Sequence, residues 1–138
     1  MNIQYAERAT LWILDLDKKR KQKVVWSRVA SDVDGVIEAP LEGSIVGEAI
    51  TSGQTINIED AYKDKRFNPK VDQKTGYVTR SVLAVPFRVG NGKVIGAIQM
   101  INKKDDDGNP STFEAGDERC VKMLGSHVAC FIRIVNSD

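Results

Sequence analysis

Two apolar segments joined by the turn Gly90-Asn91-Gly92 restrict the fold of this chain more than any other feature. Residues 82–89 and 93–102 predict paired β-strands, because glycine and asparagine supply the positive φ angles that tight hairpin turns need. Pro86 lies inside the first segment. Since proline cannot donate to a strand ladder, Pro86 predicts a sheet edge or a bulge at that point.

Shorter elements are predicted before the hairpin. Apolar content indicates strands or brief extended segments at residues 10–15, 24–29, 36–39 and 55–58. Short helices are predicted between and after them, at residues 44–51, 60–65 and 68–76. Ser44 and Asp60 can cap the first two helices. Asn68 followed by Pro69 starts the third, and Gly76 ends it.

The longest predicted helix, residues 114–135, has an unusually wide apolar arc. One seam along it consists of Val121, Leu124, Val128, Phe131 and Val135. A second seam beside the first consists of Cys120, Met123, His127, Cys130 and Ile134. Together the seams cover roughly 160° of the helix, against about 100° for a helix with one apolar face. Two partners are therefore expected: the sheet, and another helix from a preceding segment or a second subunit.

The order of strands, short helices, hairpin and long helix predicts the α+β class, with helices packed on one antiparallel sheet. A length of 138 residues with 41% apolar residues fits a single domain over residues 1–138. Helix formers at residues 4–8 precede the first strand, and the last helix reaches almost to Asp138. We therefore expect a domain taken from a longer multidomain protein, with its connecting helices cut.

Composition excludes several function classes. A net charge of +1 gives no bulk electrostatic case for nucleic acid or for an anionic membrane. No segment approaches the ~18 apolar residues of a membrane span, so a cytoplasmic location is expected. Cys120 and Cys130 lie ten residues apart on one predicted helix. That spacing separates them by ~15 Å, which is too far for a disulfide, so both are expected to be reduced.

The motifs of an enzyme are largely missing. His127 is the single histidine and lies on the last helix, and neither cysteine has a second cysteine at metal-ligand spacing. The chain has no glycine-rich phosphate loop of the nucleotide-hydrolase or dinucleotide type. We therefore expect no catalytic residue, no bound metal and no cofactor.

Two segments suggest ligand binding instead. The helix start at residues 43–47 offers free backbone N–H groups to an anion, although a simple capped helix would have the same sequence. Asp72, Thr75 and Thr79 follow at helical spacing, so a carboxylate and two hydroxyls could face the edge of a heterocycle. The alternative for these three residues is a solvated polar helix face.

Specific motifs in the second half resemble a known family. Ile58-Glu59-Asp60-Ala61-Tyr62 is followed by Phe67-Asn68, Val71-Asp72 and Thr75-Gly76-Tyr77. Downstream lie Val94-Ile95-Gly96 and a five-residue signature, Asn102, Lys103, Phe113, Asp117 and Glu118. These motifs are similar to those of phosphodiesterase-type GAF domains, and the resemblance covers residues 9–132.

The resemblance implies a six-stranded antiparallel sheet of the GAF/PAS type. Lid helices would cover the ligand face, and terminal helices would lie on the opposite face, often in a homodimer. It also implies a regulatory sensor that binds a cyclic nucleotide, cGMP or cAMP, and allosterically controls a linked catalytic domain. That output domain is expected to be a 3',5'-cyclic-nucleotide phosphodiesterase.

The resemblance places ligand contacts at specific positions. Backbone amides of Ile45 and Val46 would hold the phosphate, and the lid aromatic falls at Phe67 or Asn68. The contacts to base and ribose would come from Asp72, Thr75 and Thr79. The pocket floor would include Thr10, Trp26 and Ser27, with the flat ring of Trp26 stacking on the base.

Two departures from the family leave the choice of nucleotide open. Gln99 and Ser27 stand where some members have a glutamate and an aspartate. An amide or a hydroxyl can donate as well as accept, so either cGMP or cAMP is compatible with the sequence. The signature is expected to be structural, with Lys103 and Asp117 forming an ion pair between the last strand and the last helix.

Two alternatives to a cyclic-nucleotide sensor stay open. The loss of two carboxylates is compatible with a ligand-free GAF domain that acts in dimerisation and structural coupling. Other GAF domains reduce free methionine sulfoxide or hold a bilin through a cysteine of a loop or a pocket. Here both cysteines fall on the last predicted helix.

Overall fold

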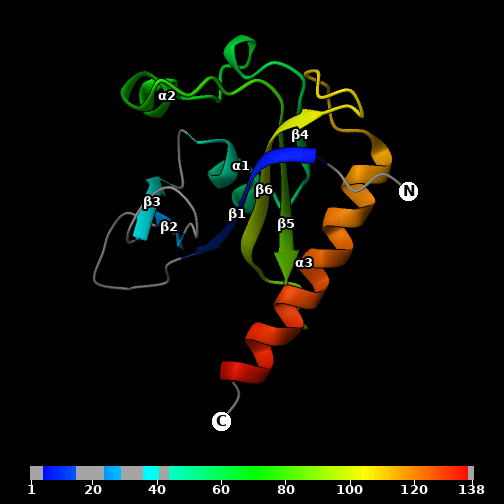
Figure 1. Cartoon of the computed structure of the whole chain (residues 1–138). Helices are drawn as coiled ribbons and strands as arrows, with labels where there is room; N and C mark the ends of the chain where they lie inside the picture. Colours follow the sequence, from blue (N-terminus) through cyan, green and yellow to red (C-terminus); the bar gives the residue numbers. More distant parts are fainter. Residues whose placement is uncertain (1–4, 15–23, 29–35, 41–43, 137–138) are drawn as a thin grey trace.

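The computed structural model describes residues 5–14, 24–28, 36–40 and 44–136 (Figure 1). The strands are β1 (Tyr5–Leu14), β2 (Val24–Arg28), β3 (Val36–Pro40), β4 (Ile56–Ile58), β5 (Val82–Arg88) and β6 (Val94–Lys104). The helices are α1 (Ile45–Ser52), the 3₁₀ turn η1 (Ala61–Lys63), α2 (Lys70–Thr75) and α3 (Ala115–Asn136). The strands pair in the order β3-β2-β1-β6-β5-β4, and every pair is antiparallel. The expected α+β class with an antiparallel sheet is confirmed.

The predicted hairpin is formed by β5 and β6. Val89 N–H donates to the Lys93 carbonyl at 3.0 Å, and Gly92 takes φ +84° in the turn. β4 pairs with β5 only from Val82 to Ala84, so Pro86 lies where the outer edge of β5 has no strand partner. A register shift follows between Phe87 and Arg88. The expectation of an edge or a bulge at the proline is confirmed.

Alternation along β5 assigns the two faces of the sheet. Val82 and Ala84 pack with Ile45 and Ala49 of α1. The intervening side chains of β5, Leu83, Val85 and Phe87, pack with Val121 and Ala129 of α3. Because successive strand side chains point to opposite faces, α1 and α3 lie on opposite sides of the sheet (Figure 1).

The first strand begins earlier than expected. Helix formers Ala6, Glu7 and Arg8 belong to β1, which pairs with β6 from Tyr5 opposite Lys104 to Ile13 opposite Gly96. The expectation of a cut helix over these residues was wrong. A long partner strand offers hydrogen bonds to alternate residues along the whole of β1, and this tertiary pairing outweighs a weak helix propensity.

Capping residues fix the short helices. The Ser44 side chain accepts from Gly47 N–H at 3.0 Å, and Asp60 accepts from Tyr62 N–H at 3.1 Å. Gly76 ends α2 at φ 75°, as predicted. The predicted start of α2 was early: Asn68 accepts from Lys70 N–H, and Pro69 occupies the N-cap instead of the first helical position. This turn before the helix satisfies the Lys70 amide, so the helical hydrogen bonds begin later.

The two seams of α3 have different surroundings. Val121 is buried against the sheet, whereas Leu124 of the same seam is 50% exposed. In the second seam Cys120, Met123, His127 and Cys130 are exposed, and Met123 reaches 65%. Val128 of the first seam is half-buried and packs on the same core as Val121, and the side chains of Phe131, Ile134 and Val135 lie outside the described part. The second partner expected for α3 is therefore not supplied by the described residues of this chain.

Candidate functional site

The start of α1 presents backbone donors on one face of the sheet. Helix geometry leaves the N–H groups of Ile45 and Val46 without an acceptor inside the helix. The side-chain cap from Ser44 reaches Gly47, the next residue along. Both apolar side chains are buried, which anchors the helix start against the sheet. These amides and the positive end of α1 together favour an anion.

A tryptophan lies directly beside this helix start. Trp12 of β1 is buried and packs with Val46 and Ile50 of α1 and with Ala97 of β6. Thr10, two residues earlier in β1, points to the same face of the sheet and pairs with Gln99 of β6. The floor under α1 therefore combines an aromatic ring, a hydroxyl and an amide.

The side chains of Trp12 and Gln99 are joined by a hydrogen bond. The indole Nε1 donates to Gln99 Oε1 at 2.8 Å. Since an indole can only donate, the glutamine must present its oxygen to the tryptophan. The Nε2 end of the amide is then available as a donor.

Asp72 organises residues 60–80, called the lid here, which pack on the same side of the sheet as α1 through Ala61 and Phe67. Its carboxylate accepts from the Tyr62 hydroxyl at 2.7 Å, from Thr79 N–H at 2.7 Å and from the Thr79 hydroxyl at 2.9 Å. Asp72 and Thr79 are both buried. The hydrogen bond to this carboxylate raises the pKa of Tyr62, because loss of the hydroxyl proton would break the bond and leave a phenolate beside a negative charge.

Among the other predicted lid residues, Phe67 contacts a member of this centre. The Phe67 ring meets the Tyr62 ring edge to face at a centroid distance of 5.1 Å. Asn68 is exposed and accepts from the Lys70 amide. Thr75 is exposed at the end of α2 and accepts from Tyr77 N–H at 3.3 Å. Of the three residues predicted to share a helix face, Asp72 and Thr79 are joined by hydrogen bonds although Gly76 ends α2 between them, and Thr75 lies in α2 with Asp72.

Asn102 connects the lid to the sheet. Its side-chain oxygen accepts from Arg80 N–H at 2.6 Å, and its Nδ2 donates to the Val78 carbonyl at 2.8 Å and to the Tyr77 hydroxyl at 3.0 Å. Asn102 adopts the left-handed φ of 60°, which asparagine tolerates better than most residues. Burial raises the pKa of Tyr77 in this cluster. The segment that leads from the lid into β5 is thereby held at both sides of Thr79.

The rest of the signature joins β6 to α3. Lys103 Nζ forms the expected ion pair with Asp117 Oδ2, and both side chains are largely buried. Asp117 also accepts from Glu114 N–H at 2.8 Å, which caps the start of α3. Phe113 is buried in the core, and Glu118 accepts from the Asn57 side chain at 3.1 Å. The described contacts of these residues join β6, α3 and β4 to one another, as expected for a structural signature.

Two predicted floor residues can be placed only by their backbone. Trp26 of β2 pairs with Ile13 of β1, and Ser27 pairs with Ile37 of β3. Their side chains lie outside the described part.

The sequence analysis missed two residues of the candidate site, Trp12 and Tyr62. Strand alternation places Trp12 on the face of Thr10, so that signal was available, whereas nothing local indicated that Tyr62 would reach Asp72.

The described residues contain neither a cluster of metal-ligating side chains nor a membrane-spanning helix. Histidine, cysteine and acidic side chains do not gather there in any group of three or more that could hold a metal ion. Within the same ranges, no helix has both the length and the apolar content needed to cross a membrane.

Comparison with known proteins identifies the family. The GAF domain family model matches residues 5–132. The dual 3',5'-cyclic-AMP and -GMP phosphodiesterase 11A of Takifugu rubripes is 37% identical over 89 residues. That match covers 64% of this chain and 10% of the relative, so the chain spans about a tenth of the length of that protein.

Solved structures agree on the fold. The type II free methionine-R-sulfoxide reductase of Thermoplasma acidophilum gives a TM-score of 0.68 at 16% identity, over 91% of this chain and 78% of that one. The GAF domain of an Acinetobacter phosphoenolpyruvate-protein phosphotransferase gives 0.65 at 20% identity, over 91% and 70%. At these identities the likeness establishes the fold alone.

Proposed function

Because the chain belongs to the GAF domain family, we propose that it is a regulatory sensor that binds a cyclic nucleotide on the α1 face. The ligand controls a linked output domain, and the phosphodiesterase relative supports a 3',5'-cyclic-nucleotide phosphodiesterase in that role. The domain itself contributes binding and not catalysis. Cys120 and Cys130 are exposed on α3, in the layer opposite α1, so they do not support the reductase alternative.

One observation carries this proposal. Val46, whose amide is a free helix donor, packs directly on Trp12. A cyclic nucleotide combines an anionic phosphate with a flat base. The amides of Ile45 and Val46 suit the phosphate, and the Trp12–Gln99 pair offers an aromatic surface and an N–H donor to the base.

The lid couples ligand binding to the output domain. Asp72 already binds Tyr62 and Thr79, and Asn102 holds the segment that follows Thr79. A nucleotide that contacts this centre would favour one arrangement of the lid over another. Ligand binding can shift the output domain only through such a difference in affinity between two states.

Isothermal titration of the purified chain with cGMP and then with cAMP tests the proposal. One-to-one binding of either nucleotide, lost in Trp12→Ala and retained in Met123→Lys, is the expected result. Met123 lies on α3, away from the proposed site, and serves as the control. The absence of heat with both nucleotides, in protein shown to be folded by circular dichroism, would refute the sensor role.

A second candidate function is a ligand-free dimerisation module. Exposed Met123 and Leu124 on α3 favour it, since large apolar side chains gathered on a helix mark interaction surfaces. The proposed interface is a homodimer through α3. Light scattering should give twice the chain mass for the native protein and the single mass for the double variant Met123→Glu, Leu124→Glu. A native monomer at all concentrations would exclude this role.

A further inference from the structure

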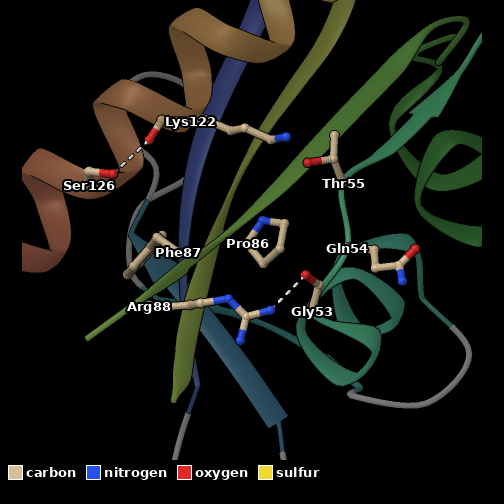
Figure 2. A pocket seen from close by; sticks show the side chains of 8 residues that line it. All are labelled: Gly53, Gln54, Thr55, Pro86, Phe87, Arg88, Lys122 and Ser126. Carbon is tan, nitrogen blue, oxygen red and sulfur yellow. Dashed lines mark hydrogen bonds between the residues drawn. The ribbon is translucent and has the colours of Figure 1, made fainter. Parts of the chain in front are cut away.

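A cavity of about 550 Å³ opens at the edge of the sheet, away from the α1 floor. It is lined by Gly53, Gln54, Thr55, Pro86, Phe87, Arg88, Lys122 and Ser126 (Figure 2). The segment after α1 forms one wall and α3 forms the other, with β5 between them. The cavity therefore touches both helical layers of the domain.

Pro86 accounts for the opening. The ladder between β4 and β5 ends at Ile56 opposite Ala84. Two residues further along β5, Pro86 has no N–H to continue the pairing with the segment before β4. The segment before β4 and strand β5 separate there, and the space between these two segments forms the cavity.

Arg88 of β5 bridges this gap to the residue that follows α1. Its guanidinium donates to the Gly53 carbonyl at 2.9 Å and to the Gly92 carbonyl at 2.8 Å. Gly53 has φ 70°, and a Cβ at this position would collide with the Arg88 guanidinium. Only two of the five N–H groups of an arginine are used by these contacts, so donors remain for a ligand.

Lys122 adds an uncompensated charge on the opposite wall. Among the described residues its ammonium has no ion-pair partner. Glu118, one turn earlier on α3, is bound by the Asn57 side chain at 3.1 Å. In Figure 2 the Lys122 ammonium and the Thr55 hydroxyl point toward each other across the cavity above Pro86.

The remaining polar groups that line the cavity, like Arg88 and Lys122, favour a negatively charged ligand. Within the described part of the chain, no hydrogen bond is made by the side-chain amide of Gln54 or by the hydroxyl of Thr55; the Gln54 backbone N–H donates to Ser52 Oγ at 3.2 Å. Each can donate, so the cavity presents two cations and two neutral donors around the apolar surface of Pro86. Its volume is within the range of about 300–1,000 Å³ that is usual for small-molecule sites.

We propose that this cavity is a second ligand site, specific for a small organic anion with a carboxylate or phosphate group and a short apolar body. The acid group lies between Lys122 and Arg88, and the apolar part lies on Pro86. The site is separate from the proposed nucleotide site, because Lys122 and Ser126 belong to α3 and the Trp12 floor faces α1. An anion bound here bridges the end of α1 to α3.

Amide chemical shifts of the ¹⁵N-labelled chain test this site at constant ionic strength. The probes are phenyl phosphate, benzoate and inorganic phosphate. The expected result is saturable shifts at Gln54, Thr55 and Lys122 with phenyl phosphate or benzoate. Inorganic phosphate should bind more weakly, because it lacks the apolar body. The stronger of the two organic probes identifies the acid group that the site prefers.

Two variants of equal charge provide the control. Lys122→Gln should weaken binding about tenfold, the loss expected for one charge-assisted hydrogen bond. Lys65→Gln, an exposed lysine remote from the cavity lining, should leave the affinity unchanged. Equal affinities in the two variants, or shifts spread over lysines across the surface, would overturn the proposal. Cyclic nucleotides should shift Ile45 and Val46 instead, so failure at one site is distinguishable from failure at the other.

Discussion

Thr79 donates two hydrogen bonds to Asp72, from its backbone N–H at 2.7 Å and from its hydroxyl at 2.9 Å. With the Tyr62 hydroxyl also bound, both carboxylate oxygens have partners within the protein. In this arrangement Asp72 organises the lid. A direct contact from Asp72 to a ligand would require it to share or release one of these bonds.

Replacing Asp72 by alanine should destabilise the domain by about 1–3 kcal/mol, since the buried Thr79 N–H would lose its acceptor. Urea unfolding of the variant gives this free energy. Asp107→Ala is the matched control, because Asp107 is exposed in the loop before α3. A midpoint for Asp72→Ala equal to that of the control would contradict the structural role.

Alkaline pH should release the bond between Tyr62 and Asp72. The pKa of Tyr62 is raised above 10.0, mainly by its hydrogen bond to Asp72. The bond therefore contributes stability that is fully present below pH 10 and is lost as pH rises through the raised pKa. In a pH titration followed by tyrosinate absorbance, Tyr62→Phe should lack one of the tyrosine transitions that the native protein shows at high pH. In Asp72→Asn the Tyr62 transition should move to lower pH, and an unchanged transition would argue against this contact.

Removing one partner of the Lys103–Asp117 pair should cost about 3–5 kcal/mol, because the other charge stays buried without compensation. Lys103→Ala should therefore lower the melting temperature without removing a ligand contact. The double variant Lys103→Met, Asp117→Leu should lose less than the sum of the two single variants. An unchanged thermal midpoint in Lys103→Ala would refute the structural role of the pair.

Two glycine-to-alanine substitutions should have opposite effects. In Gly96→Ala the new Cβ would collide with the Trp12 carbonyl and the Phe87 ring. Overpacking of this kind costs about 1–3 kcal/mol. In Gly116→Ala only the flexible end of Arg119 lies near, at 3.8 Å, so the helix should gain about 0.5–1 kcal/mol. Chemical denaturation of both variants measures the difference, and the same sign for the two would contradict the packing around Trp12.

Gln99→Glu should shift the nucleotide preference toward cGMP. In the native chain the free end of the amide is a donor, because its oxygen accepts from Trp12. That donor suits an acceptor on adenine and cannot accept from the N1–H of guanine. A carboxylate could accept from both Trp12 and guanine, so the ratio of cGMP to cAMP affinity should rise about tenfold. Titration calorimetry of both nucleotides with native and variant protein gives this ratio, and Gln73→Glu on the exposed side of α2 is the control.

Much of the fold was predictable because it depends on local chemistry. Gly90-Asn91-Gly92 predicted the β5–β6 hairpin, Ser44 predicted the start of α1, and Gly76 predicted the end of α2. Pro86 indicated the open edge of β5. Each of these signals acts through the φ angle or the hydrogen-bonding capacity of a single residue, so it can be read without knowing the neighbours in space.

The arrangement of the candidate site depended on tertiary structure. Alternation shows that Thr10 and Trp12 share a face, but only the register of β1 against β6 places Gln99 within reach of the indole. Helical spacing suggested a single face for Asp72 and Thr79, whereas a loop after α2 brings them together. The sequence by itself determined most of the elements, their order and the resemblance to the GAF family, but not the start of β1 or of α2. The tertiary structure decided which side chains meet, because strand register and loop paths are set by packing between segments far apart in the chain.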